Sequence, residues 1–180
     1  MTDYVALLRG INVGPTTQLP MQDLRRLLEE IGGRSVRTHL RSGNALFEHE
    51  GADPGKLAEA LESAVAAAFD GRKVPCLVRE AADLTRVVEH NPFDMTGVDA
   101  ARFLVVFLSG PVEPDRIAGL DPDGFAPDEF RPGAREIYVH CPGGVQKTRL
   151  SHTLWEKHLR LTATARNWNT VTRLVAMAAR

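Results

Sequence analysis

The stretch Val5-Ala6-Leu7-Leu8-Arg9-Gly10-Ile11-Asn12-Val13-Gly14 decides how the N-terminal half folds and contains the first candidate functional loop. It starts as an uninterrupted apolar run, whose length is typical of a buried central strand. The run ends in a loop with an arginine, an asparagine and two glycines. Glycine suits a backbone that turns sharply or that another group approaches closely. We therefore expect a strand over residues 4–8 and a polar loop over residues 9–14.

Five further segments continue the pattern from this strand to residue 80. Two have apolar residues at helical spacing and begin near a proline, which predicts amphipathic helices. Three others alternate or form short apolar runs, which predicts strands. The helices are expected over residues 20–33 and 53–71, and the strands over residues 36–40, 45–47 and 75–79. This order, βαββαβ, is the ferredoxin-like pattern.

The second half repeats part of this order. A linker with a short helix is expected over residues 81–100, and a second α/β subdomain over residues 101–180. The expected strands cover residues 103–108, 125–130 and 136–141, and the expected helices cover residues 114–120, 150–159 and 168–178. The predicted fold class is therefore α+β, with tandem ferredoxin-like (α/β plait) halves and two C-terminal helices.

The composition of the chain indicates its cellular compartment and excludes some kinds of site. No apolar stretch approaches the roughly 20 residues that a membrane span requires, and the first residues lack the pattern of a secretory signal. The two cysteines, Cys76 and Cys141, form no close pair, so neither a disulfide framework nor a cysteine-rich zinc site is indicated. We expect a cytoplasmic protein without a membrane partner, a metal ion or a cofactor.

The net charge of −1 is unevenly distributed along the chain. Residues 1–42 carry six arginines against four acids, residues 43–146 carry nine basic residues against eighteen acids, and residues 147–180 carry seven basic residues against one acid. Basic ends around an acidic middle could give one face of the protein an affinity for phosphates. Alternatively, these charges are the solvated faces of helices.

Topology predicts that the loop at residues 9–14 and the turn near residue 42 lie close together. A right-handed β-helix-β crossover makes the first two strands parallel, so that their carboxyl ends share one sheet edge. The group expected there is Arg9, Asn12, Arg41, Ser42 and Asn44. Guanidinium groups bind phosphate or carboxylate in a bidentate manner, so this group suits an anionic ligand. The alternative is that the glycines only turn the backbone and the asparagines satisfy loop amides.

The C-terminal segment is a second candidate site. Lys147, Arg149 and Arg166 precede Trp168, and an arginine–tryptophan pair could stack on a base or hold a phosphate. Asn167 is placed to cap the last helix as well as to contact a ligand. The alternative is that Trp168 anchors the helix in the core, because it shares a helix face with two valines.

Common catalytic and nucleotide-binding patterns are absent from the sequence. No GxxxxGK[ST], GxGxxG, GxSxG or HExxH occurs. The strand that would carry stacked aromatic residues in an RNA-recognition fold has one phenylalanine and an acid at residues 42–49. Sequence-specific RNA binding through the sheet is therefore disfavoured. No catalytic residue can be assigned.

Several motifs spread along the chain resemble one bacterial family. They are residues 4–14 (YVALLRGINVG), 21–25 (MQDLR), 36–38 (VRT), 42–44 (SGN), 91–93 (NPF) and 164–171 (TARNWNTV). On these residues the chain resembles the domain-of-unknown-function (DUF) 1697 family. The resemblance implies an α+β fold of two related subdomains and no established activity, substrate or cofactor. Members often have lysines after the glycines of the first loop, whereas this chain reads Pro15-Thr16-Thr17-Gln18. An anion site here should therefore be weaker or use other residues.

Three functions stay open at this point. The first is a binding module for a phosphate-bearing ligand, either a nucleotide or a nucleic acid. The second is a small-molecule enzyme with a site between the two halves. The third is a scaffold or interaction protein in which the polar motifs are structural.

Overall fold

The computed structural model describes residues 1–179 and divides into two compact units. Unit 1 comprises residues 1–84 and 174–179, and unit 2 comprises residues 85–173. The boundary falls inside helices α3 (Ala81–Glu89) and α6 (Trp168–Ala178). The predicted subdomain limits at residues 80 and 101 stay a prediction.

Unit 1 contains an antiparallel sheet in the order β2-β3-β1-β4. Its elements are β1 (Thr2–Leu8), the 3-10 helix η1 (Pro15–Thr17), α1 (Met21–Glu30), β2 (Arg34–His39), β3 (Asn44–His49), α2 (Pro54–Ala68) and β4 (Cys76–Glu80). β3 lies between β1 and β2 and is antiparallel to both, as the crossover topology predicted. β4 pairs with the other edge of β1.

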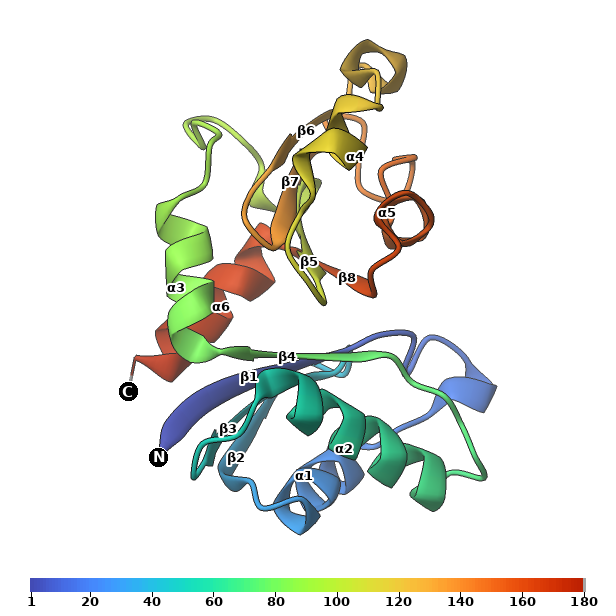
Figure 1. Ribbon diagram of the computed structural model, residues 1–180, viewed down its shortest axis with the longest axis vertical. Helices are drawn as coiled ribbons and strands as arrows, with labels where there is room; N and C mark the ends of the chain where they lie inside the picture. Colours follow the sequence, from blue (N-terminus) through green and yellow to red (C-terminus); the bar gives the residue numbers. More distant parts are fainter. Residues whose placement is uncertain (180) are drawn as a thin grey trace. The chain divides into compact units, whose positions relative to one another are not determined.

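The core of unit 1 lies between this sheet and the helices α1 and α2, which cover one sheet face (Figure 1). Alternate residues of β1, such as Tyr4, Ala6 and Leu8, point into this core. The helices add leucines at helical spacing, including Leu24 and Leu28 from α1. Both helices therefore bury their apolar stripes on the same face of the sheet.

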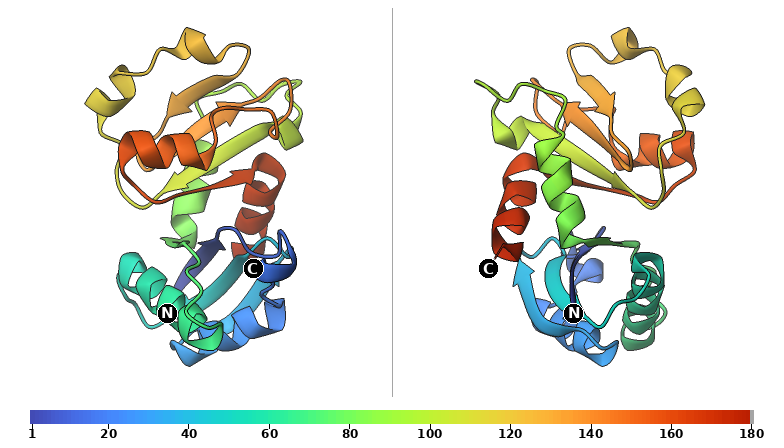
Figure 2. Two further views of the ribbon diagram at one scale, coloured as in Figure 1. Left: turned by 90° about the vertical axis from the view of Figure 1, so that its right-hand side faces the viewer. Right: turned by 60° about the vertical axis from the view of Figure 1, so that its left-hand side comes forward.

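Unit 2 repeats the element order of unit 1 and has a sheet in the order β6-β7-β5-β8. Its elements are η2 (Ala100–Arg102), β5 (Phe103–Leu108), α4 (Pro114–Ala118), η3 (Pro122–Phe125), β6 (Glu129–Pro132), β7 (Glu136–His140), α5 (His152–Leu159) and β8 (Ala163–Asn167). α4 and α5 lie on one face of this sheet (Figure 2). Trp155 of α5 is fully buried in the core between the sheet and these helices. On the other face, the Tyr138 hydroxyl donates to the Val87 carbonyl oxygen at 2.7 Å.

Three details of the expected elements were wrong. The strand β8 was missed, because Ala163–Asn167 consists of small and polar residues and pairs on one side only, with β5. The strand expected at residues 125–130 begins only at Glu129, because Asp121 caps a 3-10 turn that extends to Phe125. The first helix begins at Met21, and Pro20 precedes it as the N-cap.

The fold is thus a mixed α+β structure with two four-stranded antiparallel sheets and, within residues 1–179, six α-helices. None of the helices in this range has the length and apolar character to cross a membrane.

Candidate functional site

Two loops of unit 1 meet at the carboxyl end of β1, as the topology predicted. Leu7 pairs with Asn44 across the sheet, and the Leu8 N–H donates to the Gly43 carbonyl oxygen at 2.8 Å. The Arg9 N–H donates to the Pro75 carbonyl oxygen at 3.0 Å, so the segment before β4 also reaches this edge. We call residues 9–18, 40–44 and 72 the β1 rim.

The two asparagines of the β1 rim hold its loops together. Asn12 has a left-handed backbone, with φ +55°, and its amide spans the loop. Its Nδ2 donates to the carbonyl oxygens of Leu19 at 2.9 Å and Arg41 at 2.6 Å, and its Oδ1 accepts from the Leu19 N–H at 2.9 Å. Asn44 is fully buried, and its Nδ2 donates to the His39 carbonyl oxygen at 2.9 Å. Its Nδ2 also lies 3.1 Å from the Oγ of the adjacent turn serine. Both amides therefore fix the shape of the β1 rim.

Gln18 links two arginines of the β1 rim, Arg41 and Arg72. The Arg41 Nη2 donates to the Gln18 Oε1 at 3.2 Å, and the Arg72 Nη1 donates to the Gln18 carbonyl oxygen at 2.6 Å. The Gln18 amide in turn donates to the Gly14 carbonyl oxygen at 2.9 Å. Within residues 1–179, neither Arg41 nor Arg72 has a carboxylate partner. The β1 rim thus holds two guanidinium groups that no carboxylate of the described residues neutralises.

Arg72 and Gln18 were missed by the sequence reasoning. The crossover topology predicts where the hairpin before β3 lies, and the pairing of β4 with β1 places the segment before β4. Because β4 is antiparallel to β1, its start lies beside the end of β1, and this brings Arg72 to the same edge. Gln18 lies in the same loop as Asn12 and reaches both Arg41 and Arg72.

The C-terminal candidates all lie in unit 2, where most of them make structural contacts. Lys147 is exposed, and the Arg149 guanidinium donates to the Gly124 carbonyl oxygen and lies 5.2 Å from the ring centre of Phe125. Arg166 is buried, and its Nη1 donates to the Thr164 hydroxyl at 2.8 Å. A role of these residues in binding stays a prediction.

Asn167 and Trp168 join β8 to α6. The Asn167 Oδ1 accepts from the Thr170 N–H at 2.9 Å, which is the expected helix cap. The Trp168 ring packs edge-on against Phe103, with ring centres 5.4 Å apart. These contacts fit the anchoring interpretation of Trp168, and a ligand contact by either residue stays a prediction.

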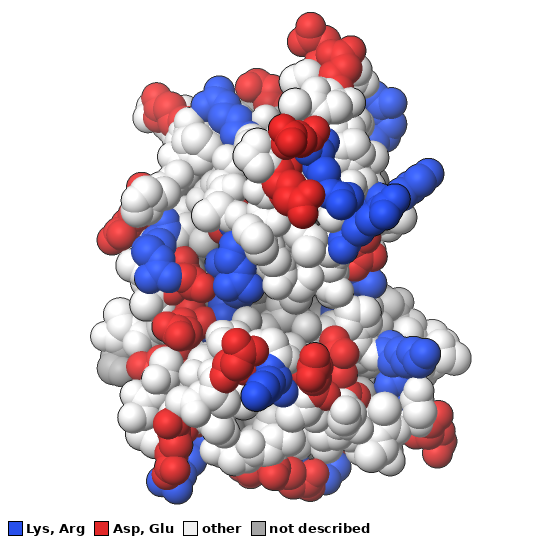
Figure 3. Space-filling view, viewed as in Figure 1, with Lys and Arg blue, Asp and Glu red and all other residues white. Residues whose placement is uncertain are grey.

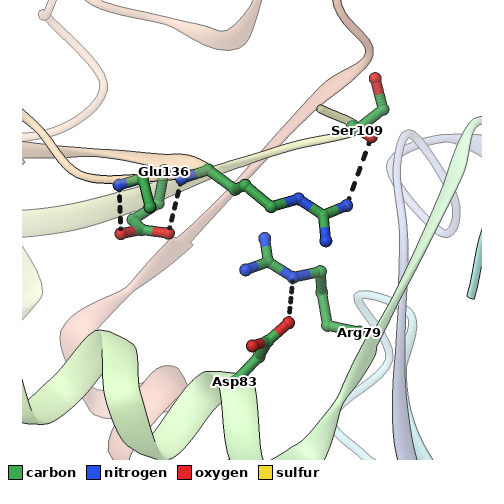
Figure 4. A network of polar contacts seen from close by, with 6 residues as sticks. Arg79, Asp83, Ser109 and Glu136 are labelled. Atoms are coloured by element: carbon green, nitrogen blue, oxygen red, sulfur yellow. Dashed lines mark hydrogen bonds and ion pairs between the residues drawn. The ribbon is translucent and has the colours of Figure 1, made fainter. Parts of the chain in front are cut away.

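Buried charged groups in each unit have local partners (Figure 4). In unit 1, Arg79 Nε lies 3.1 Å from the Asp83 carboxylate. In unit 2, the Glu136 carboxylate accepts from the backbone N–H groups of Ala134 at 3.1 Å and Arg135 at 3.2 Å. The Arg135 guanidinium donates to the Ser109 carbonyl oxygen at 3.3 Å. Burying a charge is costly unless it is paired and hydrogen-bonded, so these contacts offset the cost of burying Arg79 and Glu136.

Within residues 1–179, no three His, Cys, Asp or Glu residues are grouped to hold a metal ion.

Ionisation of Cys141 should make the stability of the fold depend on pH. Burial raises the pKa of its thiol to about 11, and a hydrogen bond with Thr148 opposes that rise. The unfolded thiol loses its proton near pH 9, so between pH 9 and 11 the folded state binds more protons than the unfolded state. The free energy of unfolding therefore does not depend on this thiol below about pH 9, and it decreases by about 2 kcal/mol between pH 9 and pH 11.

Urea unfolding at pH 8, 9, 10 and 11 checks this prediction, with Cys141→Ala as the matched control. Other groups titrate in both proteins, so the difference between the two curves isolates Cys141. A parallel decline of both proteins would contradict the assigned burial effect.

The fold and the β1 rim define an α+β protein with two four-stranded sheets and a basic sheet edge in unit 1. The chain belongs to the family described as protein of unknown function (DUF1697), whose model matches residues 1–138. It is also similar in structure to the conserved bacterial protein SP0830 from Streptococcus pneumoniae, with 23% sequence identity and a TM-score of 0.76. That alignment covers 100% of this chain and 99% of the other, and at this identity it establishes the fold alone. No curated protein matches the sequence.

Proposed function

We propose that the protein binds a phosphate-bearing ligand, a nucleotide or a nucleic acid, at the β1 rim of unit 1. The observation that carries this proposal is the pair of guanidinium groups, Arg41 and Arg72, which Gln18 orders and which have no carboxylate partner in residues 1–179. Guanidinium forks match phosphate oxygens, and arginine is the residue of choice for such recognition. Arg9 and Ser42 belong to the same edge and add a third cation and a hydroxyl group.

The rigidity of the β1 rim supports the same proposal. A site that is already shaped loses less conformational freedom on binding than a mobile one. The amides of Asn12 and Asn44 brace the two loops, so the arginines next to them start from fixed backbone positions. The predicted ligand-binding role of the asparagines becomes an indirect one in this proposal.

The finer assignment of the fold is part of this proposal. We infer that each sheet belongs to a ferredoxin-like plait, supported by the βαββαβ order and by the sheet orders β2-β3-β1-β4 and β6-β7-β5-β8. A cytoplasmic location is proposed as well, and the two buried free cysteines support it.

A thermal-shift screen over nucleotides, sugar phosphates and oligonucleotides tests the binding proposal. A ligand at a hundred times its Kd should raise the Tm of the wild type by about 5 °C or more. The double variant Arg41→Ala/Arg72→Ala should lose this rise. Arg26→Ala is the matched control, because Arg26 is an exposed arginine of unit 1 already paired with Glu30 at 2.6 Å. An equal rise in the double variant would overturn the proposal.

Salt dependence separates the two kinds of phosphate ligand. Binding of a nucleic acid releases counterions, so its affinity should fall steeply between 50 and 200 mM salt. A mononucleotide makes few phosphate contacts, and its affinity should fall much less over the same range. Fluorescence anisotropy with a labelled oligonucleotide and with a labelled nucleotide provides the comparison.

A further inference from the structure

Unit 2 contains a pocket of about 400 Å³ between α4 and α5, separate from the β1 rim. Its lining consists of Arg116, Leu154, Lys157, His158 and Arg160. Four of these side chains are basic, one is apolar and none is acidic. We propose that this pocket binds a small phosphate-bearing molecule, independently of the β1 rim.

Two of the three cations that line the pocket, Lys157 and Arg160, have no carboxylate partner within residues 1–179, and the third, Arg116, is paired on one side only. Arg116 pairs through Nε with Glu113 at 2.6 Å, which leaves its two Nη groups without a hydrogen bond in residues 1–179. The side chains of Lys157 and Arg160 likewise make no hydrogen bond or ion pair within that range. Figure 3 shows Lys and Arg side chains gathered over α5, with acidic side chains over the neighbouring α4. An anion entering the pocket would meet the cations of Lys157 and Arg160 and the two Nη groups of Arg116, whose charge Glu113 partly offsets.

His158 holds the two walls of the pocket in place. Its Nε2 is hydrogen-bonded to the Arg116 carbonyl oxygen, which ties α5 to α4. A carbonyl oxygen only accepts, so Nε2 must carry a proton and donate. Because this contact fixes the backbone that carries Arg116, the first cation of the pocket has a defined position.

The backbone of Arg160 indicates that its side chain is used. Arg160 ends α5 in the left-handed conformation, with φ +57°, at a position where glycine is the usual residue. A non-glycine residue in that conformation carries a conformational cost, and such costs gather at functional sites. Its exposed guanidinium lines the pocket and, within residues 1–179, has no internal partner to explain why arginine is present.

Size and lining favour a small phosphate compound over a nucleic acid. The volume lies in the range of small-molecule sites, and no aromatic side chain lines the pocket on which a base could stack. The carboxyl end of a helix repels an anion with the equivalent of roughly half a charge. Three cationic side chains outweigh that repulsion, and a phosphate dianion gains more from them than a monovalent anion does.

The competing explanation is that Lys157 and Arg160 only complement the dipole of α5, since cations at the last turn stabilise a helix. Arg160→Gly separates the two explanations through binding. Glycine relieves the left-handed backbone and removes the cation at the helix end in either case. Only the binding explanation predicts that the affinity for phosphate falls.

The experiment is a titration of the ¹⁵N-labelled full chain with inorganic phosphate and, separately, with glycerol 3-phosphate, at constant ionic strength maintained with sodium chloride. We expect amide shifts in residues 115–118 and 154–161. Removing either guanidinium, by Arg116→Ala or Arg160→Gly, should raise the Kd about tenfold, because a hydrogen bond to a charged group is worth at least that factor. Arg173→Ala, a substitution in unit 2 outside the pocket, should leave the Kd unchanged.

Each outcome decides the proposal. Tighter binding of glycerol 3-phosphate than of inorganic phosphate would identify a phosphomonoester site, and the reverse order would identify a site for free phosphate. No shift in residues 115–118 and 154–161, or an unchanged Kd in Arg160→Gly, would overturn the proposal. Shifts in residues 9–18 and 40–44 report on the β1 rim in the same spectra, so the two sites can succeed or fail separately.

Discussion

Gly43→Ala is expected to lower the free energy of unfolding by about 2–4 kcal/mol, combining the strain of a left-handed residue with that of overpacking. Gly43 has φ +91° at the turn between β2 and β3. A Cβ atom there would lie 2.8 Å from the Leu8 Cβ and 2.9 Å from the Ile11 Cδ1. The absence of a side chain is what allows the hairpin to touch the end of β1.

Gly10→Ala is the matched control for this prediction. Gly10 lies in the same rim and also has a positive φ, +73°, but a Cβ atom added to it would meet no other atom within 4 Å. It should cost only about 1 kcal/mol, the conformational part alone. Urea unfolding of the three proteins measures both effects. Equal losses would mean that close contact between the loops contributes nothing to stability.

Trp155→Ala is expected to cause the largest loss in unit 2, about 3–5 kcal/mol, as is usual for a buried aromatic residue replaced by alanine. The Trp155 side chain is fully buried, and its ring packs edge-on against Phe130 with centres 5.2 Å apart. Its indole N–H donates to the Leu150 carbonyl oxygen at 3.2 Å. Alanine removes the ring contact and the hydrogen bond together and leaves a cavity under α5.

Trp155→Phe separates these contributions. Phenylalanine keeps an aromatic ring in the core but leaves the Leu150 carbonyl oxygen without the indole donor, so we expect a smaller loss of about 1–3 kcal/mol. Denaturant unfolding monitored by circular dichroism measures both variants. For Trp155→Ala, a loss below about 1 kcal/mol would contradict the position of this residue at the centre of the core.

The clearest signals in the sequence came from segments whose pattern and burial agree. The apolar run before Arg9 and the helical leucines of residues 21–31 are buried on one sheet face, so pattern recognition located these elements well. The strand Ala163–Asn167 could not be recognised, because its residues are small or polar and its pairing with β5 is a long-range contact. A capped turn likewise overrode the apolar pattern near Phe125.

For the candidate site, topology was more informative than residue spacing. It predicted that the loop with Arg9 and Asn12 meets the turn at Arg41, although about thirty residues separate them. It could not decide between a ligand-binding role of the asparagines and the alternative that they satisfy loop amides, since this depends on individual hydrogen-bond geometry. The basic lining between α4 and α5 could not be predicted either, because Arg116 lies about forty residues before Lys157 and Arg160.

In the proposed site, Gln18 organises Arg41 and Arg72 to bind an anion at the β1 rim. The most direct measurement is the Kd of Gln18→Ala for inorganic phosphate, followed through the amide signals of residues 9–14 at constant ionic strength. The substitution leaves the net charge unchanged. We predict binding roughly fivefold weaker than in the wild type, because a disordered guanidinium must be positioned at the moment of binding. An unchanged Kd, or rim signals that do not respond to phosphate in the wild type, would contradict this claim.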